Sequence, residues 1–170
     1  KGNDLYEVIN INEDKQRGYL VAIYDPSKVK VATAKTMGTS GQMLVTMAKD
    51  NKALVAINGS GVQHSGGNRV TGTAIKNGKV YAKGRDINKG GGLIGFTKDN
   101  VLMLTKKSAK EAIKDGMDRA VEFGPFLIVN GKPSKFSGNG GGGKHPRTAI
   151  AQRQDGIVLF LVIEGRTSSS

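Results

Sequence analysis

The stretch NGGGGKHPRTAIAQRQDGIVLFLVIEGR, residues 139–166, decides the fold that we expect for this chain. It predicts one strand over Thr148–Gln152 and a strongly apolar strand over Ile157–Ile163, joined by a tight turn at Asp155-Gly156. Asp-Gly between two apolar runs is a strong hairpin signal, with both central residues at positive φ. Antiparallel pairing would then place the His-Pro-Arg segment before the first strand beside the Glu-Gly-Arg segment after the second.

These two strand ends carry the predicted catalytic residues, which are His145, Arg147, Glu164 and Arg166. Pro146 favours an extended conformation at His145, so the imidazole and the Arg147 guanidinium are presented at the start of the strand. A guanidinium binds phosphate or carboxylate through two parallel hydrogen bonds, although a plain surface arginine is the alternative. Glu164 is either a general base or nucleophile, or the ion-pair partner of Arg166, which points to the same side of an extended chain. This group of side chains favours an anionic substrate.

Asn58, Gly59 and Glu122 form a second set of candidate substrate-binding residues. Asn58 and Gly59 end the apolar run Ala53–Ile57, which we expect to be a strand buried on both faces, and ligands commonly lie where a scaffold element ends in polar groups. Asn58 either binds a substrate hydroxyl or caps its own turn. Glu122 supplies a second carboxylate, and most glycosidases use two carboxylates near one pocket.

The rest of the chain predicts an α+β fold with a mixed, mostly antiparallel sheet built from hairpins and two or more helices. One helix should open at Met37–Gln42, capped by Thr39 or Ser40, with Met43 and Met47 on a core face. A second helix is expected over Ala109–Asp115, because Ser108 and Glu111 form a capping box and Gly116 stops the helix. The expected strands are Leu5–Ile11, Tyr19–Tyr24 and Val29–Lys35 in a meander, Thr71–Lys76 with Lys79–Tyr81, Gly92–Thr97 with Val101–Thr105, Ala120–Phe123 and Phe126–Val129.

The amino-acid composition indicates which binding partners would suit this chain. Lys and Arg number 26 against 14 Asp and Glu, giving a net charge of +12 that suits a phosphorylated sugar or an anionic cell-envelope polymer. The aromatic residues lie inside apolar strands, so no nucleic-acid partner is predicted. The absence of cysteine excludes disulfides and thiol catalysis, and no cluster of metal ligands or cofactor motif appears, so neither metal nor cofactor is expected. No apolar run reaches the length of a membrane span, and residues 1–11 lack a signal-peptide layout.

Five motifs in order resemble the phosphodiester glycosidase family, which includes the enzyme that removes N-acetylglucosamine from mannose 6-phosphate and bacterial proteins labelled as exopolysaccharide biosynthesis proteins. They are MGTSGQ (37–42), AKDNKALVAINGSG (48–61), GTAIKNGKV (72–80), EFGPFLIVNGKP (122–133) and HPRTAIAQRQDGIVLFLVIEGR (145–166).

The resemblance implies hydrolysis of a sugar-1-phosphodiester, with release of the sugar from a phosphomonoester. Arg147 and Arg166 would stabilise the phosphate leaving group. Glu164 would activate water or stabilise the transition state, and His145 would act as an acid or orient the phosphate. Asn58, Gly59 and Gly124 would shape the sugar pocket, and Thr148 would join Glu122 in binding the substrate.

The chain departs from the family pattern at three places. Glu164-Gly165-Arg166 stands where the family usually has Asp-Gly-Arg, and Ser60-Gly61-Val62 stands where Gly and an aromatic usually follow. The family also continues beyond this motif, so we expect a single domain over residues 1–170 that lacks its C-terminal segment. The expected location, inherited from the family, is extracellular or at the cell envelope, and the alternative function is a non-catalytic module that binds anionic cell-wall polysaccharide.

Overall fold

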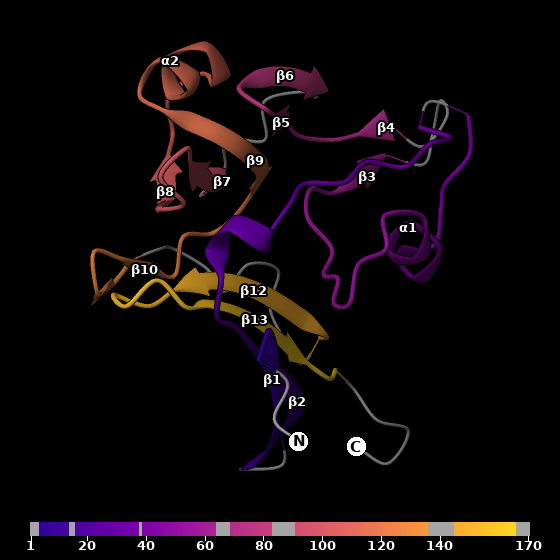
Figure 1. The fold of residues 1–170 in the computed structure, drawn as a ribbon, viewed down its shortest axis with the longest axis vertical. Helices are drawn as coiled ribbons and strands as arrows, with labels where there is room; N and C mark the ends of the chain where they lie inside the picture. The colour runs from indigo at the N-terminus through magenta and orange to yellow at the C-terminus, as the bar shows by residue number, and fades with distance from the viewer. Residues whose placement is uncertain are drawn as a thin grey trace. The chain divides into compact units, whose positions relative to one another are not determined.

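The computed structural model describes residues 4–13, 16–37, 39–63, 69–82, 91–135 and 145–165 (Figure 1). Its contacts divide the chain into two compact units, which are described separately here. Unit 1 combines Lys1–Val29 with Ser137–Ser170, and unit 2 is the intervening segment Lys30–Phe136.

Unit 1 is built on a four-stranded antiparallel sheet in which the two ends of the sequence pair with each other. Its strands, in spatial order, are β1 (Tyr6–Glu13), β2 (Gln16–Ile23), β13 (Val158–Ile163) and β12 (Arg147–Gln152). Val158 and Phe160 of β13 are buried with Val21 and Ala22 of β2, and this apolar contact joins the two hairpins. The predicted meander is therefore wrong, because β2 takes β13 as its second neighbour and Val29–Lys35 forms no strand after the short 3-10 helix η1 (Pro26–Lys28).

The β12–β13 hairpin forms as predicted, but its turn has a different geometry. The register pairs Arg147 with Ile163 and Gln152 with Val158. In this turn only Gly156 has a positive φ, of 91°, whereas the φ of Asp155 is not positive. The Arg153 N–H donates to the Ile157 carbonyl at 2.9 Å, which leaves a three-residue loop that needs one left-handed residue instead of two.

Unit 2 contains a five-stranded antiparallel sheet with one helix packed on it. The spatial order is β6 (Lys79–Ala82), β5 (Ala74–Lys76), β9 (Met117–Phe123), β7 (Gly92–Thr97) and β8 (Leu102–Thr105). Helix α2 (Ala109–Lys114) buries Ala112 against Ile75, Met117 and Ala120. Its predicted capping box is confirmed, since Ser108 and Glu111 bond to each other's backbone N–H groups.

Two Asn-Gly pairs make the tightest turns of unit 2. At Asn77-Gly78 both residues have positive φ, 51° and 66°, as a two-residue hairpin loop requires. Asn130-Gly131 has the same conformation, with φ of 50° and 74°. The latter joins β10 (Ile128–Val129) to β11 (Lys132–Pro133), while β3 (Val62–Gln63) pairs with β4 (Arg69–Val70).

Three predictions for the first third of unit 2 are wrong. Helix α1 (Leu44–Asp50) starts after Met43, which offers no side-chain cap, so neither Thr39 nor Ser40 caps it. Met43 is 76% exposed and does not fill a core. Ala53–Ile57 forms no strand, and Leu54 is 67% exposed. A short apolar run does not by itself identify a buried strand, because periodicity is uninformative over so few residues.

The pairings of the described strands are all antiparallel, and most of them are local hairpins. The predicted α+β fold is confirmed in part: the sheets are built mostly from antiparallel hairpins and two helices are present, but no parallel pair among the described strands makes a sheet mixed. Strands outweigh the two short helices so strongly that the fold is mostly β. Among the described residues, no helix combines the length and the apolar character that crossing a membrane requires.

Candidate functional site

The end of the β12–β13 hairpin in unit 1 brings the predicted catalytic segments together. Arg147 lies opposite Ile163, so Glu164 follows directly beyond the paired position. A Cβ atom added at Gly165 would lie 2.3 Å from Cδ of Pro146, which shows that the backbone at Gly165 passes directly against Pro146. The two strand ends are therefore adjacent, as the hairpin predicted.

The sheet fixes the backbone of Glu164 while leaving its side chain accessible. Its N–H donates to the carbonyl of Arg17 at 2.8 Å, which continues the β2–β13 ladder by one residue. Glu164, Arg147 and Thr148 are exposed, and His145 is half-buried. A carboxylate held on a rigid strand end and open to solvent is able to act on a bound molecule.

One predicted catalytic residue, Arg166, lies outside the described residues. Its predicted role stays a prediction.

Glu122 of β9 is a buried carboxylate with a defined partner in unit 2. It is 6% exposed, and its Oε2 accepts a hydrogen bond of 2.7 Å from the backbone N–H of Thr73. Its own N–H donates to Oγ of Ser60 at 3.0 Å. Ser60 is one of the departures from the family pattern, so this side chain adds a link that glycine would not supply.

Three of the predicted substrate-binding residues gather at the end of β9. A Cβ at Gly59 would lie 2.9 Å from Cγ1 of Val121, so the Asn58-Gly59 segment packs closely on this strand. Gly124 follows the strand and lies against Gly91, where an added Cβ would come within 2.7 Å of the Gly124 Cα. Asn58 is exposed beside this packed glycine. The structure thus brings Gly59, Glu122 and Gly124 together, whereas Thr148 and Glu164 belong to unit 1.

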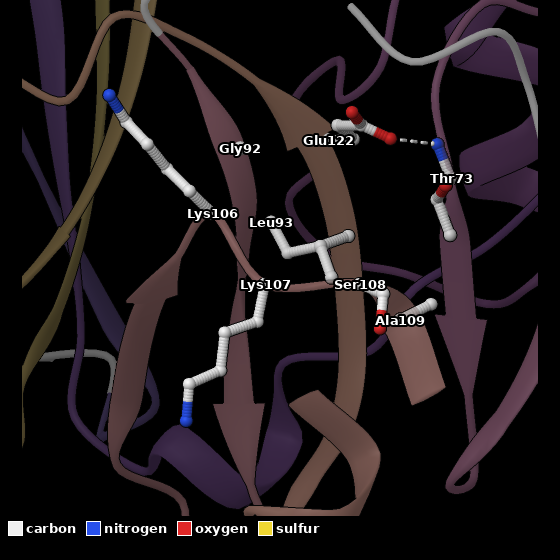
Figure 2. Close-up of a pocket in the computed structure, with 8 residues that line it drawn as sticks. All are labelled: Thr73, Gly92, Leu93, Lys106, Lys107, Ser108, Ala109 and Glu122. Carbon is white, nitrogen blue, oxygen red and sulfur yellow. Dashed lines mark hydrogen bonds between the residues drawn. The ribbon is translucent and has the colours of Figure 1, made fainter. Parts of the chain in front are cut away.

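A cavity of about 150 Å³ opens beside Glu122. Figure 2 shows the Glu122–Thr73 hydrogen bond at one side of it, and the side chains of Lys106 and Lys107 diverging from each other and pointing away from that carboxylate. The cavity is lined by Thr73, Gly92, Leu93, Lys106, Lys107, Ser108, Ala109 and Glu122. Its lining includes the hydroxyl-bearing residues Thr73 and Ser108 and the carboxylate-bearing Glu122.

Most of these cavity residues carry no signal in the sequence that identifies them as part of a site. Thr73 and Ser108 come from segments 49 and 14 residues from Glu122. The available signal was Gly72, where an added Cβ would lie 2.9 Å from the Glu122 Cβ. A glycine inside a predicted strand, here Thr71–Lys76, often marks a close approach by a neighbouring chain segment.

The ionisable groups around the cavity have defined partners. A hydrogen bond and the nearby charge of Asp115 hold the pKa of Lys107 above its ordinary value, with Nζ 2.5 Å from the carboxylate. Hydrogen bonds from the Ser108 side chain and backbone lower the pKa of Glu111. Because Lys107 pairs with Asp115, the charge of its ammonium group is already balanced by a neighbouring carboxylate. Within the described ranges, no three His, Cys, Asp or Glu side chains are grouped so as to hold a metal ion.

Truncating Glu122 should destabilise the protein more than neutralising it. Glu122→Ala leaves the buried Thr73 N–H without an acceptor, which should lower the free energy of unfolding by about 2 kcal/mol. Glu122→Gln keeps an acceptor oxygen and should cost about 1 kcal/mol or less. Urea unfolding followed by circular dichroism measures both, with the exposed Glu13→Ala as control. Equal effects of the two substitutions would contradict the role given to this hydrogen bond.

The sequence of this chain is similar to a known protein family and to a bacterial protein. A sequence model of the family described as phosphodiester glycosidase matches residues 51–170. The SPbeta prophage-derived uncharacterized protein YomE of Bacillus subtilis (strain 168) is 31% identical over 158 residues, which cover 86% of this chain and 24% of that protein.

A solved structure is also similar to this chain. The catalytic domain of zebrafish N-acetylglucosamine-1-phosphodiester alpha-N-acetylglucosaminidase, auto-inhibited by its pro-peptide, matches with a TM-score of 0.66 and 17% sequence identity. The match covers 95% of this chain and 61% of that one. At this identity the comparison shows a shared fold.

Proposed function

Because the chain belongs to the phosphodiester glycosidase family, we propose that it hydrolyses a sugar-1-phosphodiester and releases the sugar from a phosphomonoester. The observation that carries the proposal is the end of the β12–β13 hairpin. There the accessible Glu164 carboxylate and the Arg147 guanidinium lie on adjacent strand ends of one sheet.

In this proposal, the arginines at the two strand ends act on the leaving phosphate, and Glu164 acts on the attacking water. The bond between the anomeric carbon and the phosphate oxygen breaks, and its electron pair leaves with the phosphate. Arg147 and Arg166 stabilise that charge as it develops. Glu164 accepts a proton from the water whose oxygen bonds to the anomeric carbon, and His145 orients the phosphate or supplies a proton.

Within unit 2, a saccharide-binding role is assigned to residues around the end of β9. Glu122 and Thr73 line the cavity there, the Asn58-Gly59 segment packs on the strand, and Gly124 follows it. Within unit 1, Thr148 is assigned as a donor and acceptor for a sugar hydroxyl.

We assign the substrate to phosphodiester-linked glycans of a bacterial cell envelope, with the protein outside the cell or at its envelope. The net charge of +12 supports an anionic polymer as the substrate. The relative from a prophage of Bacillus subtilis supports a bacterial setting. The chain spans 24% of that relative, so this assignment concerns the domain alone.

The direct test is release of free sugar from N-acetylglucosamine-1-phosphate diesters. We expect turnover by the wild type and about a 100-fold lower kcat/KM for Arg147→Ala, since losing one guanidinium that stabilises a developing charge typically costs a few kcal/mol. Arg153→Ala is the matched control. It removes an exposed arginine from the opposite end of the same hairpin, where the guanidinium pairs with Asp155 at 2.6 Å.

Equal turnover by Arg147→Ala and Arg153→Ala would remove Arg147 from the mechanism. Complete lack of turnover by the wild type, with binding of teichoic-acid-like polymers that Arg147→Ala weakens, would instead favour a non-catalytic binding module. The same protein samples serve both assays, so the two functions are separated directly.

A further inference from the structure

One face of the four-stranded sheet of unit 1 is buried at one end and exposed at the other. Residues that lie directly opposite each other in antiparallel strands project to the same face. Val21 of β2 and Phe160 of β13 are such a pair, and both are buried. Val158, two residues before Phe160 and therefore on the same face, is also buried. In the direction of Glu164 the same face carries mostly polar, exposed side chains.

Two rows of side chains cross the exposed end of this face. In the first row, Asn10 of β1 lies opposite Tyr19 of β2, which lies opposite Val162 of β13. Thr148 of β12 lies opposite Val162 and completes the row. Asn10, Tyr19 and Thr148 are exposed. The row therefore presents an amide, an aromatic ring and a hydroxyl group.

The second row contains the predicted catalytic carboxylate. Asn12 of β1 lies opposite Arg17 of β2. The hydrogen bond from the Glu164 N–H to the Arg17 carbonyl extends the β2–β13 ladder, so Glu164 lies opposite Arg17 and on the same face. All three side chains are exposed. We call the polar residues of the two rows the polar end of the sheet: Asn10, Asn12, Arg17, Tyr19, Thr148 and Glu164.

Arg17 and Glu164 are neighbours of opposite charge that do not pair with each other. Directly opposed residues of two strands have Cβ atoms about 5 Å apart. In the part of the chain that the structure describes, neither side chain nevertheless forms an ion pair. Both charged groups are therefore available to a bound molecule.

Arg17 is placed more directly than Arg147 to meet an anion beside Glu164. Arg147 lies opposite Ile163, one residue before Glu164, so it begins β12 on the other face of the sheet. Its guanidinium reaches a molecule beside Glu164 only around the strand end. Arg17 flanks that molecule on the same face, and its charge offsets the repulsion between a phosphate and the Glu164 carboxylate.

We propose that the polar end of the sheet binds a sugar phosphodiester, with Arg17 on the phosphate and the ring of Tyr19 against the sugar. This inference rests on the proposed function for the choice of ligand, and it adds residues that precede the matched segment 51–170. A guanidinium binds a phosphate through two parallel hydrogen bonds. The Tyr19 ring offers an apolar surface with a hydroxyl at its tip, which suits a sugar. Residues two apart on a strand are about 7 Å apart, so the two side chains contact neighbouring parts of one ligand.

The test measures binding of N-acetylglucosamine 1-phosphate and of uncharged N-acetylglucosamine by NMR titration. Arg17→Gln should bind the sugar phosphate at least about tenfold more weakly than the wild type, because it loses charged hydrogen bonds, and should bind the uncharged sugar equally well. Arg17→Lys keeps the charge without the planar fork and should give an intermediate affinity. Tyr19→Leu should weaken the binding of both ligands by a similar factor, about threefold or more.

The matched control variants are Arg153→Gln and Tyr24→Leu. Arg153 is an exposed arginine at the opposite end of the β12–β13 hairpin, and Tyr24 is an exposed tyrosine just beyond the opposite end of β2. Each control removes the same chemical group from unit 1 as its counterpart. Each should change either affinity less than about twofold, because exposed charges distant from a ligand are screened.

Equal affinity of Arg17→Gln and Arg153→Gln for the sugar phosphate would overturn the inference, and so would failure of the wild type to bind this ligand. In hydrolysis of the diester, Arg17→Gln should raise KM at least about tenfold with a smaller effect on kcat. Turnover with unchanged KM in this variant would refute the inference and leave the proposed reaction standing. Binding that depends on Arg17 and Tyr19, without hydrolysis by the wild type, would refute the reaction and support the binding site.

Discussion

The Glu164→Gln variant is expected to release sugar from a sugar-1-phosphodiester about 1,000-fold more slowly than the wild type, because a positioned general base contributes factors of this order. Glutamine has the same shape but does not accept the proton of the attacking water. The fold should be unaffected, since Glu164 is exposed and its link to Arg17 uses the backbone N–H. The loss should therefore appear in kcat, with little change in KM.

The conservative variant Glu164→Asp provides the control for this experiment. It retains a carboxylate and introduces the residue that the family usually carries in this motif, so it should keep a substantial part of the activity. Steady-state kinetics on the same diester, with melting curves to confirm folding, compare the three proteins. Unchanged kcat in Glu164→Gln would remove Glu164 from catalysis and leave it as half of an ion pair.

The Gly95→Ala variant is expected to lose at least about 3 kcal/mol of folding free energy, because overpacking against an immobile backbone leaves no side chain to move aside. Gly95 of β7 lies directly opposite Ala120 of β9. An added Cβ would lie 2.1 Å from the carbonyl oxygen of Arg119 and 2.4 Å from Cβ of Ala120. The two central strands of unit 2 would have to separate to accept it.

Gly156→Ala is the matched control for this substitution. Its Cβ would enter open space, so the remaining cost comes from the φ of 91° and should be about 1 kcal/mol. Chemical unfolding and the soluble fraction on expression compare the two variants. A Gly95→Ala protein as stable as Gly156→Ala would show that β7 and β9 are more loosely paired than the structure indicates.

The sequence was most informative where structure depends on neighbouring residues. Asn77-Gly78 specifies its own turn through two left-handed residues, and Ser108 with Glu111 specifies the start of α2. The adjacency of Arg147 and Glu164 was predictable for the same reason, since one short hairpin creates it. Local signals of this kind need no knowledge of the rest of the chain.

The sequence was least informative where structure depends on distant residues. Nothing in β2 identifies β13 as its partner, because several apolar strands in the chain would fit beside it equally well. The surroundings of Glu122 depend on Thr73 and Ser60, which are 49 and 62 residues away in sequence. The failed prediction of a strand at Ala53–Ile57 has the same origin, since a buried strand needs neighbours that an apolar run does not specify.

The pairing of β2 with β13 also has a consequence for the protein while it is being made. β2 leaves the ribosome early, but the strand that completes its sheet follows only after all of unit 2 has been synthesised. At ordinary rates of translation this interval is on the order of ten seconds. During it, β1 and β2 form at most a hairpin with one open edge carrying Leu20 and Val21. The nascent chain therefore presents an apolar strand edge until β13 has been made, and unit 2 has the opportunity to fold first.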